Sequence, residues 1–133
     1  MTLGVRAAVF DAEGRVFLLR HTYVPGWHFP GGGVERGETA HDALARELAE
    51  EGNIVLQDEA ALFGFYFNNA VSPRDHVAFY VVRRFAQSGP QKPNHEIAEA
   101  RFFSLDALPE GTSQATRARL KEISEGTPAA KTW

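Results

Sequence analysis

Three glutamates occupy positions 47, 50 and 51 of one helix-forming stretch, and their spacing places them close together. On a helix that turns about 100° per residue, Glu47, Glu50 and Glu51 span about 100° of arc. That arc overlaps the edge of an apolar stripe marked by Leu44 and Leu48. The carboxylates are therefore expected where the helix meets the rest of the protein, rather than on its fully solvated face.

Clustered carboxylates repel one another. Two unit charges about 4 Å apart repel by about 4 kcal/mol at an effective dielectric constant of 20, and the negative end of the helix dipole adds to the strain. A divalent cation would neutralise the cluster, and hard oxygen ligands suit Mg²⁺ or Mn²⁺. A glutamate-rich solvated helix face is the other interpretation, and the helix alone does not decide between them.

Three consecutive glycines, Gly31, Gly32 and Gly33, follow Pro30 and precede the helix. Because glycine has no Cβ, such a segment can bring backbone carbonyls and amides within reach of a metal ion or a phosphate. A simple turn would also explain the glycines, so they only add to the argument from the carboxylates.

Local patterns predict the elements that hold these residues in place. Apolar runs at 5–10 and 15–21 flank a turn sequence and predict a β-hairpin. Residues 22–33 are rich in proline and glycine and predict a loop with a short strand at its aromatic residues. A helix is expected over 40–51, with Thr39 as N-cap and Asp42 as its capping-box partner, ended by Gly52 and Asn53.

The second half of the chain predicts further strands and one more helix. Aromatic and β-branched runs at 61–69 and 76–85 indicate two strands joined by a hairpin loop, and 96–105 contains another. A second helix is expected over 113–124, with Ser113 as a cap. The segment from about residue 125 has no periodicity and is expected to be flexible.

Composition limits the classes of function. The 133 residues suit a single domain spanning 1–133, and 44% of them are hydrophobic, which is enough for a core. A net charge of −3 gives no reason to expect extended nucleic-acid binding or a membrane surface. No cysteine, secretory signal or membrane span is recognised in the sequence, so a cytoplasmic protein is expected.

The stretch from Gly32 to Ile54 resembles the signature of the Nudix hydrolases. That signature is a glycine, five residues, a glutamate, seven residues, and then Arg-Glu-apolar-any-Glu-Glu-any-Gly-apolar. Five residues separate Gly32 from Glu38, and seven more lead to Arg46, which opens the run Arg-Glu-Leu-Ala-Glu-Glu-Gly-Asn-Ile. The one departure is Asn53, and asparagine is the residue other than glycine that best tolerates left-handed dihedrals.

The resemblance implies an α/β fold, an α/β/α sandwich with a mixed β-sheet between helices. It implies hydrolysis of a nucleoside diphosphate linked to another group, with divalent cations. Metal ligation is carried over to four residues: Glu47, Glu50, Glu51 and the backbone carbonyl of Gly31. Glu47 would also act as, or position, the general base. Arg46 would hold the carboxylates by charge-assisted hydrogen bonds, with Glu38 in a supporting role.

Residues outside the signature complete the predicted site. Many Nudix enzymes recruit a further acid, for which Glu96 and Glu99 are the candidates, although each could be an ordinary surface glutamate. Trp27 is expected to stack on a nucleobase because it lies just before the glycines. The other substrate-binding candidates are His28, Gly32 and Gly33.

The expected partner is a nucleotide or nucleotide derivative, and the small size favours a nucleoside triphosphate pyrophosphohydrolase. A catalytically silent Nudix domain that senses a nucleotide is one alternative, and an interaction domain is another. A homodimer is left open.

Overall fold

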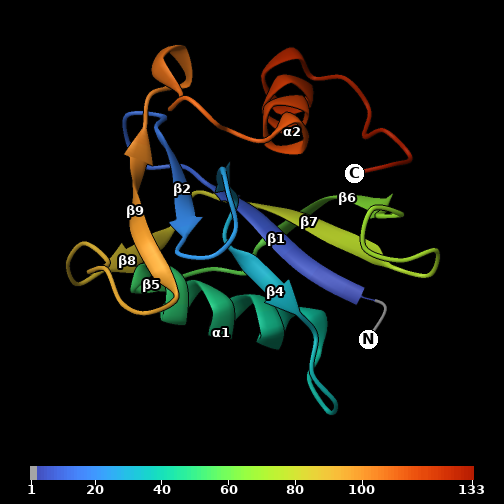
Figure 1. Cartoon of the computed structure of the whole chain (residues 1–133), viewed down its shortest axis with the longest axis horizontal. Helices are drawn as coiled ribbons and strands as arrows, with labels where there is room; N and C mark the ends of the chain where they lie inside the picture. The colour runs from blue at the N-terminus through green and yellow to red at the C-terminus, as the bar shows by residue number, and fades with distance from the viewer. Residues whose placement is uncertain (1–2) are drawn as a thin grey trace.

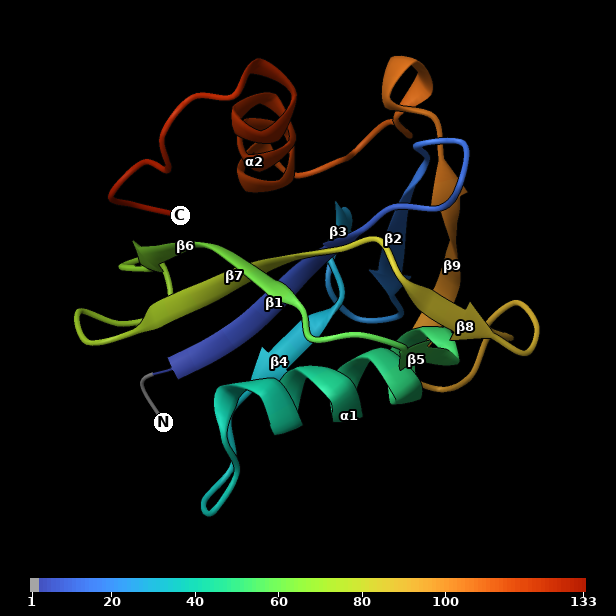
Figure 2. The same ribbon diagram turned by 180° about the vertical axis from the view of Figure 1, so that it is seen from behind.

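The computed structural model describes residues 3–133, and its two helices lie on opposite sides of a layer of strands (Figure 1). Helix α1 (Ala40–Gly52) covers one face and helix α2 (Gln114–Glu125) the other, as the reverse view also shows (Figure 2). The predicted α/β/α arrangement is therefore confirmed. No helix within residues 3–133 has the length and apolar character needed to span a membrane.

In the part of the chain that the structure describes, four strands precede α1, and five lie between α1 and α2. In chain order they are β1 (Leu3–Val9), β2 (Val16–His21), β3 (Trp27–His28), β4 (Gly31–Gly33), β5 (Ile54–Leu56), β6 (Ala61–Phe67), β7 (His76–Val82), β8 (Phe85–Gln87) and β9 (Ile97–Phe103), and a 3₁₀ turn (Leu105–Ala107) follows. Hydrogen bonds divide them into three groups with the orders β4-β1-β7-β6, β3-β2-β9 and β5-β8. The first group is mixed, because β1 runs parallel to β7 and antiparallel to β4.

The predicted hairpin between the first two strands is wrong. Strand β1 pairs with β4 and β7, and strand β2 pairs with β3 and β9. Only the Phe10–Val16 bridge and a hydrogen bond from the Asp11 amide to the Arg15 carbonyl join them at the turn. Both strands are largely buried and each takes partners on both edges. These partners come from distant parts of the chain, which local turn chemistry does not reveal.

Three short strands were absent from the predictions or misplaced. Strand β4 is the glycine triplet itself, expected as a loop, and it pairs with β1 with Gly31 opposite Arg6. Strand β5 had no sequence signal, and the predicted strand 76–85 is divided between β7 and β8, since β8 leaves to pair with β5. Glycine has little intrinsic preference for strands, so only tertiary pairing reveals β4.

Helix α1 is positioned as its sequence predicts. Leu44 and Leu48 are fully buried in a core that also includes strands β1 and β2. Thr39 and Asp42 form the capping box, and Asn53 ends the helix at φ 55° in the left-handed region. A second core lies toward α2 and holds Leu120. The helix that carries the glutamates is thus fixed at both ends and along its apolar face.

The segment after α2 is docked on the fold. Trp133 contacts the rings of Tyr66 and Phe79 at centroid distances of 5.3 and 5.4 Å. Its amide donates to the Phe67 carbonyl at 2.9 Å, and its carbonyl accepts from Arg119 Nη1 at 2.9 Å. A single aromatic side chain and backbone pairing anchor this segment, neither of which produces a periodic pattern in the sequence.

Candidate active site

Glu51 is the deepest carboxylate of the site. Its side chain projects from α1 to β4, where Oε1 accepts a hydrogen bond from the Gly31 amide at 2.8 Å. The residue is only 9% exposed. Burial raises the pKa of Glu51 to about 7, with the neighbouring Glu47 charge adding to the effect and the Gly31 amide opposing it. Glu51 therefore sits at the boundary between helix and protein, as the helical wheel predicts.

Glu47 lies one turn earlier and also faces β4. Its Oε1 accepts a hydrogen bond from Arg46 Nη1 at 2.7 Å, yet burial still raises the pKa of Glu47 above its ordinary value. A Cβ on Gly32 would lie 2.6 Å from Glu47 Oε1. The absence of a side chain at Gly32 is thus what allows the carboxylate to approach the strand.

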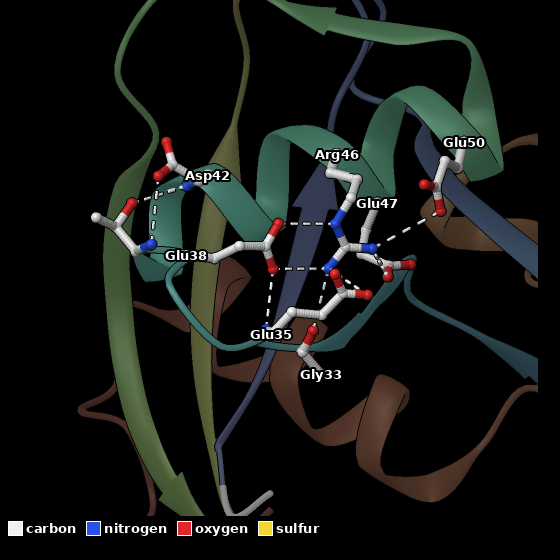
Figure 3. A network of polar contacts seen from close by, with 8 residues as sticks. Gly33, Glu35, Glu38, Asp42, Arg46, Glu47 and Glu50 are labelled. Atoms are coloured by element: carbon white, nitrogen blue, oxygen red, sulfur yellow. Dashed lines mark hydrogen bonds and ion pairs between the residues drawn. The ribbon is translucent and has the colours of Figure 1, made fainter.

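Arg46 organises the polar contacts around the helix (Figure 3). Its Nε and Nη2 donate to the two Glu38 oxygens at 2.8 and 2.9 Å, and Nη2 also donates to the Gly33 carbonyl at 3.2 Å. The Arg46 hydrogen bonds hold the pKa of Glu38 down at about 2, aided by the Glu35 amide. Arg46 therefore ties α1 to the glycine strand and to the connection between them.

Glu50 lies apart from the other two glutamates of the helix. Its side chain is 60% exposed, and its nearest charged partner is Arg46 at 3.8 Å (Figure 3). Within the described residues, no group of three or more Asp, Glu or His side chains is arranged to hold a metal ion. The three carboxylates share one helix, but only Glu47 and Glu51 converge.

Glu47, Glu51 and Gly31 line a cavity of about 390 Å³. The remaining lining residues come from β1, β2, β3, the loop between β2 and β3, and the position just before β9: Arg6, His21, Tyr23, Val24, His28 and Glu96. The structure therefore brings Glu96 to the site. Glu99 does not line this cavity, because its carboxylate faces Arg20 at 3.6 Å and Arg101 at 3.3 Å.

The cavity fits a hard divalent cation by its donor chemistry. Two partly or fully buried carboxylates face one space, and burial raises the pKa of both. Carboxylate and carbonyl oxygens are the donors that Mg²⁺ and Mn²⁺ prefer. The site thus offers suitable ligands, although Glu47 is engaged with Arg46 and Glu50 is turned to solvent.

Trp27 does not lie at this cavity. Its ring is 7% exposed and packs edge-on against Phe103, with centroids 4.9 Å apart. Strand β3 pairs with β2 and presents Trp27 to the core, so the geometry gives no support to the expected stacking on a nucleobase. His28, from the same strand, does line the cavity, and its Nε2 lies 3.0 Å from the Pro25 carbonyl.

Arg6, His21 and Tyr23 are cavity residues that the sequence did not place at the site. By residue type alone, Arg6 and His21 are possible phosphate or base contacts, but no spacing in the sequence ties them to the signature, and nothing in the sequence singles out Tyr23. Tyr23 is 71% exposed, and its ring lies 5.7 Å from that of His21. The available signal was the arginine within the otherwise apolar run of β1, where a charged side chain needs a structural or functional reason.

The family of the chain is established by comparison with known proteins. The model of the NUDIX domain family matches residues 1–123, so the chain belongs to the Nudix family. The MutT NUDIX hydrolase from Burkholderia pseudomallei has a similar structure, with a TM-score of 0.78 and 27% identity over 92% of this chain and 97% of that one.

Two curated proteins show how far the sequence similarity extends. The ADP-ribose pyrophosphatase of Methanocaldococcus jannaschii is 31% identical over 104 residues, which is 76% of this chain and 61% of that protein. The RNA pyrophosphohydrolase of Gluconobacter oxydans is 43% identical over 49 residues, 35% of this chain and 29% of that protein. The chain therefore matches about three-fifths of the first relative and under a third of the second.

Proposed function

We propose that this protein hydrolyses a pyrophosphate bond in a nucleoside diphosphate linked to another group, in a reaction that depends on Mg²⁺ or Mn²⁺. The observation that carries the proposal is the convergence of Glu47, Glu51 and Gly31 on one cavity. These residues belong to, or adjoin, the Nudix signature that the family match covers.

Each residue of the site has a proposed role that follows from its position. Glu47, Glu51 and the Gly31 carbonyl would hold the cation, with Glu96 as the further acid on the same cavity. Glu50, which is 60% exposed, would have to turn from solvent to join them. The cation would neutralise the pyrophosphate oxygens and lower the pKa of an attacking water. Glu47, whose pKa is raised by burial, is suited to receive or direct a proton. Arg46 holds Glu47 in place, and Gly32 leaves the space in which it sits.

The substrate is proposed at two levels. A nucleotide derivative is supported by the family and by the pyrophosphatases among its relatives. Within that class, ADP-ribose is suggested by the pyrophosphatase of Methanocaldococcus jannaschii, and the nucleoside triphosphates are the other candidate substrates. Both belong in the first test.

The test follows the formation of AMP and ribose 5-phosphate from ADP-ribose, and of nucleoside monophosphate and pyrophosphate from the nucleoside triphosphates, with Mg²⁺ and with EDTA. We expect Mg²⁺-dependent turnover of at least one compound, and a loss of orders of magnitude in Glu47→Gln. Glu125→Gln on the exposed end of α2 is the matched control and should keep wild-type turnover. Nucleotide binding without hydrolysis would contradict the proposal and indicate a silent sensor domain.

A further inference from the structure

Arg6 crosses the glycine strand to reach the cavity. It lies on β1 directly opposite Gly31 of β4, and a Cβ at Gly31 would stand 2.8 Å from Arg6 Cδ and 2.9 Å from its Cα. The missing side chain at Gly31 therefore leaves the path that the arginine stem follows. The same glycine donates its amide to Glu51, so arginine and glutamate are placed by one backbone position.

The guanidinium group of Arg6 has unused donors. Nη1 donates to the Phe29 carbonyl at 2.9 Å, and this is its one side-chain hydrogen bond within residues 3–133. No Asp or Glu oxygen of the described residues lies within 4.0 Å of it. A guanidinium carries five N–H donors, and a half-buried charge without an ion pair is costly. The remaining donors are thus available to an acceptor that the chain itself does not supply.

Two neighbouring cavities have Arg6 in common. It lines the cavity of about 390 Å³ that holds Glu47 and Glu51. Among the described residues that line this cavity, Arg6 is the one Lys or Arg. It also lines a cavity of about 220 Å³ with Gly33, Asn68 and Asp75. Ligand pockets usually measure about 300–1,000 Å³. The second cavity alone is therefore small for a whole ligand, and the two together suit one that extends past Arg6.

The charge of Arg6 matches what a diphosphate requires. The larger cavity is lined by the carboxyl groups of Glu47, Glu51 and Glu96, which oppose an anionic ligand. Burial lowers the pKa of Arg6, while Glu51, Glu47 and Asp75 act in the opposite direction. A planar guanidinium fork binds phosphate oxygens in pairs, which gives it both charge and direction.

We propose that Arg6 binds a phosphate of the substrate beside Glu47 and Glu51, and that it directs the nucleoside beyond that phosphate into the cavity of Asn68 and Asp75. The inference rests on the proposed function, because it takes the ligand to be a nucleoside diphosphate derivative. A purely structural Arg6 would instead serve only the Phe29 carbonyl and would affect stability without affecting ligand affinity.

Calorimetric binding of two non-hydrolysable probes tests both parts of the inference. The probes are α,β-methylene ADP, whose P–C–P bridge resists hydrolysis, and methylenediphosphonate, which lacks the nucleoside. Both are titrated in Mg²⁺ into the wild type, Arg6→Gln and Arg6→Lys. Loss of a charge-assisted hydrogen bond predicts about 10- to 100-fold weaker binding of both probes by Arg6→Gln. Arg6→Lys should fall between, because lysine keeps the charge without the fork.

Asn68→Ala separates the nucleoside part from the phosphate part. It should weaken α,β-methylene ADP several-fold and leave methylenediphosphonate unchanged. Arg84→Gln, an exposed arginine paired with Asp58 at 3.5 Å, is the matched control and should bind both probes as the wild type does. Equal weakening of both probes by Asn68→Ala would refute the placement of the nucleoside.

Thermal melting accompanies each titration. If Arg6→Gln does not fold, the test of phosphate binding rests on Arg6→Lys. Wild-type affinity of Arg6→Lys for both probes would refute bidentate phosphate binding. Wild-type affinity in a folded Arg6→Gln overturns the whole inference while leaving hydrolysis untouched. If the wild type binds both probes through Arg6 but hydrolyses no nucleotide, the inference stands and the proposed activity fails.

Discussion

Replacing Glu51 with glutamine should stabilise the metal-free protein at neutral and alkaline pH. Glu51 is buried, and folding raises its pKa from 4.5 to about 7. Between these two pH values the folded protein keeps a proton that the unfolded chain has released. The free energy of unfolding of the wild type therefore falls as the pH rises from about 4.5 to about 7, and the loss is complete above that.

The size of the effect follows from that shift. Each pKa unit corresponds to 1.36 kcal/mol, so the penalty reaches about 3 kcal/mol at pH 8 and about 1 kcal/mol at pH 5. A glutamine at this position has no ionisable proton, and its amide oxygen can still accept the hydrogen bond from the Gly31 amide. Glu51→Gln should thus exceed the wild type in stability by about these amounts.

Urea unfolding at pH 5 and pH 8 in EDTA measures the difference. Repeating the pH 8 experiment in Mg²⁺ adds a second readout, because a ligand that binds only the folded state stabilises it by mass action. We expect Mg²⁺ to stabilise the wild type and to have little effect on Glu51→Gln. A stability difference that is the same at both pH values would refute the assignment of a buried, titrating Glu51.

Three further substitutions test other parts of the structure. Tyr66→Phe removes the 2.8 Å hydrogen bond from the tyrosine hydroxyl to buried Glu122 and should cost about 1–3 kcal/mol of unfolding free energy in urea titrations. Gly32→Ala places a methyl group against Glu47 and should lower turnover at least tenfold while circular dichroism stays native; wild-type turnover would show that Glu47 adapts freely. Trp27→Ala should lose about 3–5 kcal/mol of stability, and KM of the folded enzyme should stay unchanged; a rise in KM at unchanged stability would restore the stacking hypothesis.

Helix α1 could be read from the sequence because its determinants are local. Thr39 and Asp42 cap its start, Asn53 ends it, and Leu44 and Leu48 mark the buried face. The partial burial of the glutamates followed from the same geometry. The separation of Glu50 from the other two glutamates could not be predicted in this way. The direction of the Glu47 side chain depends on Arg46, and Glu50 is turned to solvent.

Residues that reach the site from other elements could not be read in this way. Arg6 is at the cavity because β1 pairs with the glycine strand, a pairing that no local pattern encodes. The position of Trp27 depends on tertiary contacts in the same way. Its neighbours in the sequence are the glycines, but its neighbours in space are Phe103 and the core.

The parallel pairing of β1 with β7 has a consequence for how the site comes into being. It joins Leu3 to His76 and Val9 to Val82, so the chain must close a long loop before the strand opposite Gly31 has its other neighbour. Loop closure must precede the gain from such contacts, and proteins dominated by non-local pairing fold in about milliseconds to seconds. The signature peptide from Gly32 to Ile54, synthesised alone, should accordingly lack a metal site, because Gly31 and the strand that supports it would be missing.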